Sequence, residues 1–194
     1  LIARLPTVRG RYSENVDMSL FTWFRVGGMA EVIFRPADLE DLSGFLENKK
    51  EKSPVTVIGA TSNLLVRDGG IPGVVIRLGK PFSNIVPLQK SLRVGSAALN
   101  SQVSRAALRA DRTGLEFLSG IPGTIGGGLR MNAGSYGSEF KDILIEAEIM
   151  DPIGNVHVWS VDELGFKYRQ CSVDSDWIFL SALFKAPLAE PDEI

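Results

Sequence analysis

The chain has 194 residues, of which 44% are hydrophobic and 23% are charged, and its formal net charge is −2. These values are ordinary for a globular protein with a core, and they give neither the basic excess typical of nucleic-acid binding nor the like-charge run of a disordered tail. With no signal-peptide pattern and no apolar run near the length of a membrane span, we expect a cytoplasmic protein with no nucleic-acid or membrane partner.

Cysteine and histidine each occur once. Cys171 cannot form an internal disulfide, which is compatible with a reducing compartment. A single histidine, His157, argues against a zinc or iron site built on a histidine cluster, so we expect no metal. His157 falls inside an expected strand, where a structural role is the simpler interpretation.

The first third of the chain predicts a small βαβ unit. Residues 1–20 show little periodicity and are expected to form an extended arm. Residues 31–35 are β-branched and aromatic, and 55–59 are apolar and end in glycine, so both are predicted strands. Between them, 36–50 predicts a helix that begins after a Pro–Asp pair. One face of this helix carries Leu39, Leu42, Phe45 and Leu46.

The middle of the chain predicts two more strands and a second helix. Strands are expected at 73–78 and, on a weaker pattern, at 91–98. The periodicity of 99–110 predicts a helix. Its apolar side carries Leu99, Val103, Ala106 and Ala110.

The last third predicts an antiparallel sheet. Residues 143–151, 155–161 and 176–185 alternate or run apolar, as strands of such a sheet do. A capping-box pattern at 160–163 predicts a short helix over 161–166. Together the elements predict an α+β chain with two sheets.

One segment after a predicted strand can bind an anion. The strand ends at Gly59, and Ala60, Thr61, Ser62 and Asn63 follow with small side chains. Consecutive backbone N–H groups in such a turn can form an anion-binding nest. A plain strand–turn–strand connection is the alternative.

Residues 119–137 hold seven glycines, four of them from Gly123 to Gly128. Glycine costs folding entropy, so either tight turns or close approach of backbone to a ligand must require them. The order G-x-x-G-G-G does not match the dinucleotide fingerprint, and Leu129 and Arg130 stand where a triphosphate-binding loop needs Lys and Ser or Thr. The remaining interpretation is an uncharged binding site for a diphosphate that is joined to a bulky, largely apolar group.

Four motifs in order resemble the UDP-N-acetylenolpyruvoylglucosamine reductase family. They are TWFRVGG (22–28), VIGATSNLLVRDGG (57–70), SGIPGTIGGGLRMNAGSYG (119–137) and FKYRQC (166–171). The resemblance extends over most of the chain. It implies an FAD-binding fold of the vanillyl-alcohol-oxidase type, with the flavin between two α+β subdomains.

The resemblance also implies domain limits and a reaction. The subdomains would span 1–80, with the arm 1–20, and 81–194. The family's C-terminal substrate-binding domain is expected to be missing, because no GSxFKNP-like segment occurs before Ile194. The family uses non-covalent FAD and NADPH to reduce a UDP-sugar enolpyruvyl ether in peptidoglycan precursor synthesis. Alternatives are an FAD- or nucleotide-binding module without catalysis, which is what we expect of these residues alone, and another flavin oxidoreductase of the superfamily.

The implied cofactor site draws on three segments and one later residue. By the resemblance, it comprises Gly59, Ala60, Thr61, Ser62 and Asn63 at the pyrophosphate; Pro122, Gly123, Ile125, Gly126 and Gly127 at the flavin and its phosphates; Asn132, Gly134, Tyr136 and Gly137 closing the pocket; and Ile178 near the adenine or the ring system. The family usually has Gly where this chain has Thr61, so a positive φ there would strain the threonine.

The resemblance assigns the catalytic role to Arg169. In the family, the arginine of this Tyr-Arg pair stabilises an enolate-like intermediate, and a guanidinium suits that task because it stays charged and binds carboxylates in a bidentate way. A surface arginine paired with a nearby Asp is the alternative. Tyr168 would orient the substrate or Arg169. Cys171 replaces a frequent serine and is expected to be a small buried residue rather than a nucleophile.

Overall fold

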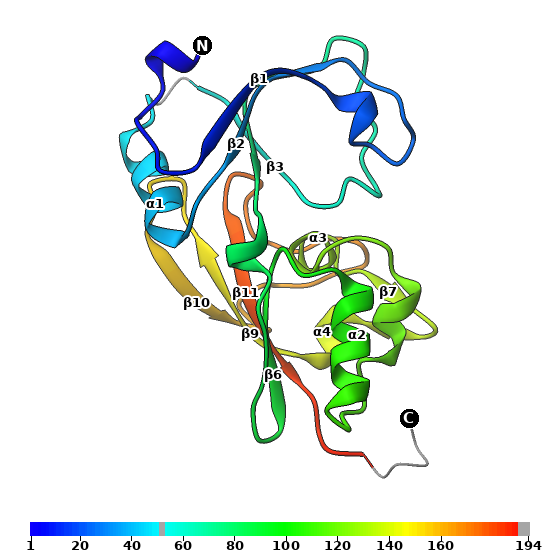
Figure 1. Ribbon diagram of the computed structural model, residues 1–194. Helices are drawn as coiled ribbons and strands as arrows, with labels where there is room; N and C mark the ends of the chain where they lie inside the picture. The colour runs from blue at the N-terminus through cyan, green and yellow to red at the C-terminus, as the bar shows by residue number, and fades with distance from the viewer. Residues whose placement is uncertain (51–52, 190–194) are drawn as a thin grey trace.

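The computed structural model describes residues 1–50 and 53–189, which are built around two larger sheets and one sheet of two short strands (Figure 1). The N-terminal sheet lies at the top of the view and the second sheet below it. Within the described residues, no helix has both the length and the apolar character needed to cross a membrane.

The first sheet has four strands in the order β1-β2-β4-β3. They are β1 (Arg11–Asp17), β2 (Met29–Arg35), β3 (Val55–Ile58) and β4 (Ile71–Arg77). Strand β4 pairs in parallel with both β2 and β3, while β1 pairs with β2 in the antiparallel sense. The predicted βαβ unit therefore exists, but β4 lies between its two strands.

Helix α1 (Leu39–Asn48) crosses from β2 to β3. Asp38 caps it by accepting a hydrogen bond from the backbone N–H of Asp41 at 3.0 Å. Three of the four predicted apolar positions are buried, whereas Leu39 is 43% exposed because it stands in the first turn, beyond the edge of the sheet-facing side. Phe34 and Phe45 join the helix to β2, with ring centroids 4.7 Å apart.

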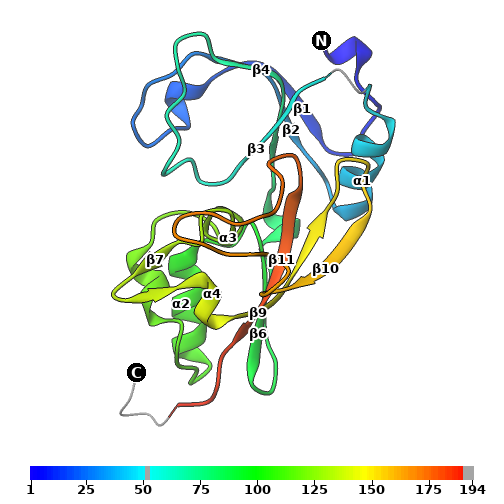
Figure 2. The same cartoon turned by 180° about the vertical axis from the view of Figure 1, so that it is seen from behind.

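The second sheet has five antiparallel strands in the order β10-β9-β11-β6-β5. They are β5 (Ile85–Pro87), β6 (Ser91–Gly95), β9 (Leu144–Met150), β10 (Val156–Ser160) and β11 (Ile178–Lys185). The antiparallel arrangement predicted for the last third of the sequence is confirmed. Figure 2 shows β9, β10 and β11 side by side from the opposite direction.

Short elements complete the second half. They are α2 (Asn100–Arg109), α3 (Ile125–Arg130), α4 (Phe140–Ile143), β7 (Gly134–Ser135) and β8 (Ser138–Glu139). Single-turn 3-10 helices occur at η1 (Ile2–Arg4), η2 (Met18–Leu20), η3 (Lys80–Phe82) and η4 (Glu116–Gly120). The buried residues of α2 are Asn100, Val103 and Ala107. Of the predicted apolar face only Val103 is among them, and Asn100 and Ala107 each lie one position after a predicted residue.

Two predictions about local structure are wrong. The expected arm contains β1, which was missed because its sequence RYSENVD lacks apolar alternation. The expected helix over 161–166 is only a turn. Its capping contacts do form, with Glu163 accepting from the backbone N–H of Ser160 at 2.8 Å, but Gly165 adopts a φ of 55° and ends the helical path after one turn.

The two sheets share one apolar core. Phe34, Phe45 and Ile76 of the first sheet and its helix pack in the same cluster as Ile178 and Leu180 of β11. A polar contact lies beside it, where Ser43 of α1 donates to the carbonyl of Gly154 in the β9–β10 turn at 2.8 Å. The halves are thus packed together on this side, and they separate on the other side.

Candidate functional site

Two adjoining pockets of about 440 Å³ and about 490 Å³ lie between the sheets. We call them together the cleft. Both are lined by Thr56, Val57, Ile58, Gly59, Ala60, Thr124, Gly127 and Arg130. Their sizes fall in the range of small-molecule and cofactor sites. The cleft runs along β3 and continues past its carboxyl end, and the carboxyl edge of parallel strands is the usual ligand-binding edge of open sheets.

The loop after β3 offers unpaired donors to the cleft. The backbone N–H groups of residues 60–63 donate no hydrogen bond to another described residue. All four residues line the pocket of about 440 Å³, next to Gly123 and Pro122 of the glycine-rich segment. Ser62 ties the two segments together by donating to the carbonyl of Pro122 at 3.2 Å. Such a row of free amides is suited to an anion.

Thr61 adopts the left-handed conformation that its family position suggested. Its φ is 55°, which is unfavourable for a β-branched residue. Its side chain is buried, and its hydroxyl lies 2.5 Å from the carbonyl of Phe21 and 2.7 Å from that of Ala60. These contacts hold the strained residue in place and attach the loop to residues 21–23.

Glycine is present at positions 126, 127 and 128 for different structural reasons. A β-carbon on Gly126 would lie 3.1 Å from that of Ser96, and one on Gly128 would overlap the ring of Phe140. A β-carbon on Gly127 would meet only Oγ1 of Thr124, at an ordinary 3.6 Å. The chain's own packing therefore does not require glycine at position 127, whereas a ligand in the cleft would.

Fewer amides of the glycine-rich segment are available than the sequence predicts. The N–H of Ile125 donates to Ala98 at 3.0 Å, and that of Gly126 donates to Ser96 at 2.8 Å. The hydroxyl of Thr124 caps α3 by accepting from Gly127 at 3.4 Å. This side of the cleft therefore allows a ligand to approach the backbone closely, but it offers few free amides for hydrogen bonds.

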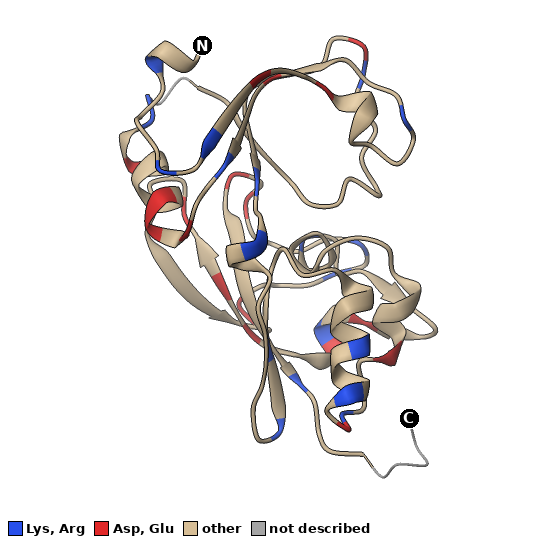
Figure 3. Ribbon diagram, in the orientation of Figure 1, with Lys and Arg blue, Asp and Glu red and all other residues tan. Residues whose placement is uncertain are grey.

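The charge of the cleft is positive. Arg77, Arg130 and Arg169 line it, and none of the described residues lining either pocket is Asp or Glu. Burial, followed by the nearby charge of Arg35, lowers the pKa of Arg77 below its usual value. Acidic residues gather elsewhere, on α1 and on β9 among other places (Figure 3). A chain of net charge −2 thus presents a cleft suited to an anion.

Arg169 lies at the edge of the cleft beside Gly134. Its Nη2 donates to the carbonyl of Gly134 at 3.3 Å, and its guanidinium lies 5.3 Å from the ring centroid of Tyr168. The residue is exposed and has a φ of 56°. Because only one donor is engaged among the described residues, the others can reach an acceptor in the cleft.

Most of the predicted site residues come together. The cleft is lined by Gly59, Ala60, Thr61, Ser62, Asn63, Pro122, Gly123, Gly126, Gly127, Gly134, Arg169 and Ile178.

The remaining predicted residues do not line the cleft. Ile125 is fully buried in the core of the second half. Asn132 is also buried, and its side chain joins Glu139, Lys167 and Lys141 in a structural network. Tyr136 and Tyr168 are 86% and 79% exposed, and Gly137 occupies the turn between β7 and β8. Packing, which motif position alone does not reveal, separates these residues from the cleft.

His157 and Cys171 were expected to be structural. His157 lies 3.0 Å from Asp151 and stacks on Trp177, with ring centroids 5.0 Å apart. Cys171 is half-buried rather than buried, with its sulfur 3.9 Å from Nη1 of Arg130. Neither residue lines the cleft.

Sequence reasoning missed several cleft residues. Arg77, inside the strand predicted over 73–78, and Arg130, inside the glycine-rich segment, were not assigned to it. Ser96 was also missed, and its buried Oγ has no hydrogen-bond partner among the described residues. No sequence pattern marks this serine.

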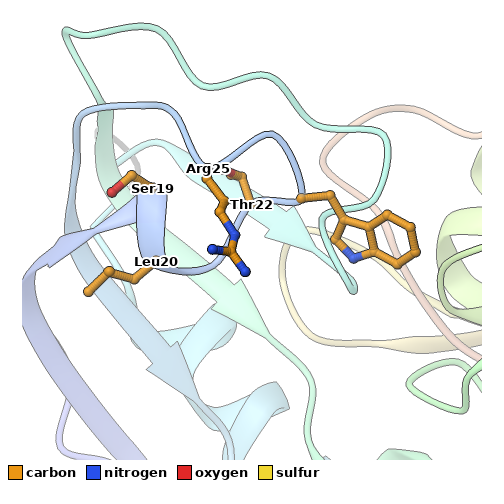
Figure 4. Close-up of a pocket in the computed structure, with 5 residues that line it drawn as sticks. Ser19, Leu20, Thr22 and Arg25 are labelled. Atoms are coloured by element: carbon orange, nitrogen blue, oxygen red, sulfur yellow. The ribbon is translucent and has the colours of Figure 1, made fainter.

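A third hollow of about 430 Å³ lies apart from the cleft, on the loop after β1. Its lining residues are Ser19, Leu20, Thr22, Trp23 and Arg25 (Figure 4). It shares no lining residue with the cleft, although the TWFRVGG motif passes through it.

Comparison with known proteins finds relatives that carry the same enzyme name. A UDP-N-acetylenolpyruvoylglucosamine reductase from Paramagnetospirillum magneticum is 53% identical over 98% of this chain and 62% of its own length. The crystal structure of UDP-N-acetylenolpyruvylglucosamine reductase from Thermus caldophilus superimposes with a TM-score of 0.82 at 33% identity, over 96% of this chain and 65% of that one. The chain thus spans less than two thirds of the length of these relatives.

The fold is shared more widely. A mutant of cholesterol oxidase from Brevibacterium sterolicum superimposes with a TM-score of 0.66 at 12% identity, over 95% of this chain and 40% of that one, which shows a common fold alone. The α+β arrangement is therefore the FAD-binding fold of the vanillyl-alcohol-oxidase type that the sequence predicted. Because the family model described as FAD binding domain matches residues 30–160, the chain belongs to the family of FAD-binding domains.

Proposed function

We propose that the cleft binds FAD without a covalent bond, and that these residues form the flavin-binding part of a UDP-N-acetylenolpyruvoylglucosamine reductase. The observation that carries the proposal is a cleft with free backbone amides, three arginines and no carboxylate, between two loops of small residues. Among the described residues that line it there is no histidine or cysteine, the usual side chains for a covalent flavin link.

The residues of the cleft fit the parts of FAD. The amides of residues 60–63 and the space at Gly127 suit a diphosphate. Ile178 and Phe179 of β11 offer an apolar wall for a ring, and the unpaired hydroxyl of Ser96 can bond a polar group there. We propose subdomain limits of 1–80 and 81–194, since the first sheet ends at Arg77 and the second begins at Ile85.

The relatives' name supplies the proposed reaction. Bound FAD would supply hydride transfer from NADPH to the enolpyruvyl double bond of the UDP-sugar. Arg169 would face the carboxylate of that group and stabilise negative charge as it develops there. Tyr168, stacked with Arg169 on the exposed side, would orient the arginine or the substrate. A cytoplasmic location follows from the proposed role in peptidoglycan precursor synthesis.

A binding module without catalysis is the second candidate. It is favoured by the features of the cleft, which suit the binding of FAD and do not by themselves require turnover. Both candidate functions include the binding of FAD, but only the reductase converts a substrate.

One preparation tests both. We expect the purified chain to be yellow, and denaturation followed by filtration should release a small molecule with the mass of FAD. Colour that stays with the denatured chain contradicts non-covalent binding, and a chain that takes up no FAD when the cofactor is added contradicts the proposal as a whole. NADPH-dependent reduction of the UDP-sugar by residues 1–194 alone would assign catalysis to these residues, whereas FAD binding without this reduction would favour the binding module.

A further inference from the structure

Arg130 holds together two walls of the cleft that are distant in sequence. It is the last residue of α3. Its Nη1 donates to the carbonyls of Val173 and Asp174 at 2.6 and 3.0 Å, and its Nη2 donates to the carbonyl of Trp177 at 2.7 Å. The guanidinium also lies 5.0 Å from the ring centroid of Phe179. One side chain thus satisfies three carbonyls of a segment that forms no helix or strand.

Apart from Arg130, the segment 172–177 is held by Val173, which is buried in the core of the second half, and by the ring of Trp177, which packs beside His157 and Trp159. The segment's described backbone hydrogen bonds are donated by Ser172, to Leu164, and by Trp177, to Asp174. Charged donors form stronger hydrogen bonds than neutral ones, and the planar guanidinium fixes several acceptors in one geometry. Arg130 therefore adds three charged hydrogen bonds that help to fix the backbone of the segment.

The segment leads directly into the cleft wall. Ser175 and Trp177 line the cleft, and Ile178 and Phe179 follow at the start of β11. On its other side, Arg130 ends the short helix α3, which lies within the glycine-rich segment and contains Gly126, Gly127 and Gly128. The same residue thus sets the distance between the glycine-rich wall and the β11 wall.

We infer that Arg130 is a positioning residue for the cofactor. By holding the 172–177 segment, it places the start of β11 where that strand can contact one end of a dinucleotide. The diphosphate of this dinucleotide would lie against α3. The inference rests on the proposed function. Arg130 is half-buried, lines both pockets and has no carboxylate within ion-pair distance among the described residues. Its charge therefore remains available to an anion in the cleft.

Three variants test the inference. Arg130→Met removes the charge and all three hydrogen bonds, Arg130→Lys keeps the charge but not the fork, and Arg109→Met is the control. Arg109 is an exposed residue of α2 with no side-chain hydrogen bond among the described residues. The readouts are the dissociation constant of FAD, measured by quenching of flavin fluorescence, and hydrogen exchange of the 172–177 amides without FAD.

We expect Arg130→Met to weaken FAD binding by about ten- to a hundredfold, the range for loss of hydrogen bonds from a charged group. Arg130→Lys should recover part of this loss, and amides of the 172–177 segment should exchange faster in both variants. The control should match the parent chain. If Arg130→Met does not fold, Arg130→Lys alone must show weaker binding and faster exchange.

Two results overturn the inference. One is an unchanged dissociation constant in the variants, and the other is unchanged exchange of the 172–177 amides. Failure of the parent chain to bind FAD is a different result, because it overturns the proposed function and with it the cofactor role of Arg130. The exchange measurement needs no FAD and still decides whether Arg130 holds the segment.

Discussion

The ring of Phe140 fills the space beside Gly128, so a β-carbon at that position would overlap its outer carbons. Phe140 is fully buried and also meets Phe117 and Phe184 edge-on, which prevents it from moving aside. The preceding residue, Gly127, is exposed and faces the cleft instead. Two adjacent glycines therefore serve different purposes, one in the core and one at the proposed cofactor site.

Alanine substitutions should separate these purposes. Gly128→Ala should destabilise the fold by about 1–3 kcal/mol through overpacking against Phe140. Gly127→Ala should leave the unfolding temperature unchanged or raise it, because alanine favours helix, yet weaken FAD binding at least about tenfold by filling the cleft. Thermal unfolding and flavin titration of both variants measure the two effects. A Gly127→Ala chain that binds FAD as well as the parent would remove α3 from the site.

The hydroxyl of Thr61 should stabilise the loop after β3. Thr61→Val keeps the shape and the β-branch at a φ of 55° but loses the contacts with the carbonyls of Phe21 and Ala60. We expect it to lower the free energy of unfolding by about 1–3 kcal/mol, as for a buried acceptor left unpaired. Thr61→Ser keeps the hydroxyl and is the matched control. Equal stability of the valine and serine variants in urea would show that the hydroxyl contributes nothing.

Asp151 should make stability depend on pH in the acid range. Burial raises the pKa of its carboxyl, but hydrogen bonds from His157, Asn155 and Ile153 outweigh this and lower the pKa from 3.8 to about 2. Because the folded pKa lies below the unfolded one, the contribution is complete above the unfolded value and is lost as pH falls through 3.8 towards 2.

Asp151→Asn provides the comparison, since asparagine has similar size and does not titrate. Near neutral pH we expect the parent chain to be more stable than this variant in urea, and the difference should shrink as pH falls from about 4 to about 2. A difference that stays constant over this range would mean that the carboxylate is not stabilised by its partners. His157→Asn, which removes one of them, should give part of the same effect.

Much of the fold was predictable because its strands have strong local patterns. The β-branched runs of β2, β3 and β4 and the apolar strands β9 and β11 carry their signal in consecutive residues. β1 was missed because it is a polar edge strand, and α3 because three glycines argue against a helix unless packing holds it. The place of β4 between β2 and β3 depends on long-range pairing that no local pattern contains.

The residues of the candidate site can likewise be separated into those that local sequence patterns predict and those that depend on packing. Gly59 to Asn63 and Gly123 to Gly127 were recognised from glycines and small residues, which are local signals, and the structure places both segments at the cleft except for the side chain of Ile125. Arg77 and Arg130 could not be found, since their positions depend on how the two sheets pack. Asn132 has the residue type of a binding group, yet its hydrogen bonds hold residues 139–141 and 167.

The final prediction concerns Arg169 in the proposed reductase. Arg169→Met keeps the length and bulk of the side chain but removes its charge and its donors. Arg169 is exposed, lines the cleft and has one hydrogen bond among the described residues, to Gly134. Its removal should therefore leave the fold intact, and urea unfolding is the control for this expectation.

The loss should appear in the step that reduces the substrate. Removing one preorganised donor to a developing charge typically costs ~10²–10³ in kcat, about 2.7–4 kcal/mol. Consumption of NADPH in the absence of substrate builds no negative charge beside Arg169, so that half-reaction should change much less. Arg169→Lys should recover only part of the rate, because an ammonium lacks the planar fork. Stopped-flow absorbance follows the two half-reactions separately. Equal slowing of both would mean that Arg169 holds the fold or the cofactor, and no slowing of either would make it an ordinary surface arginine.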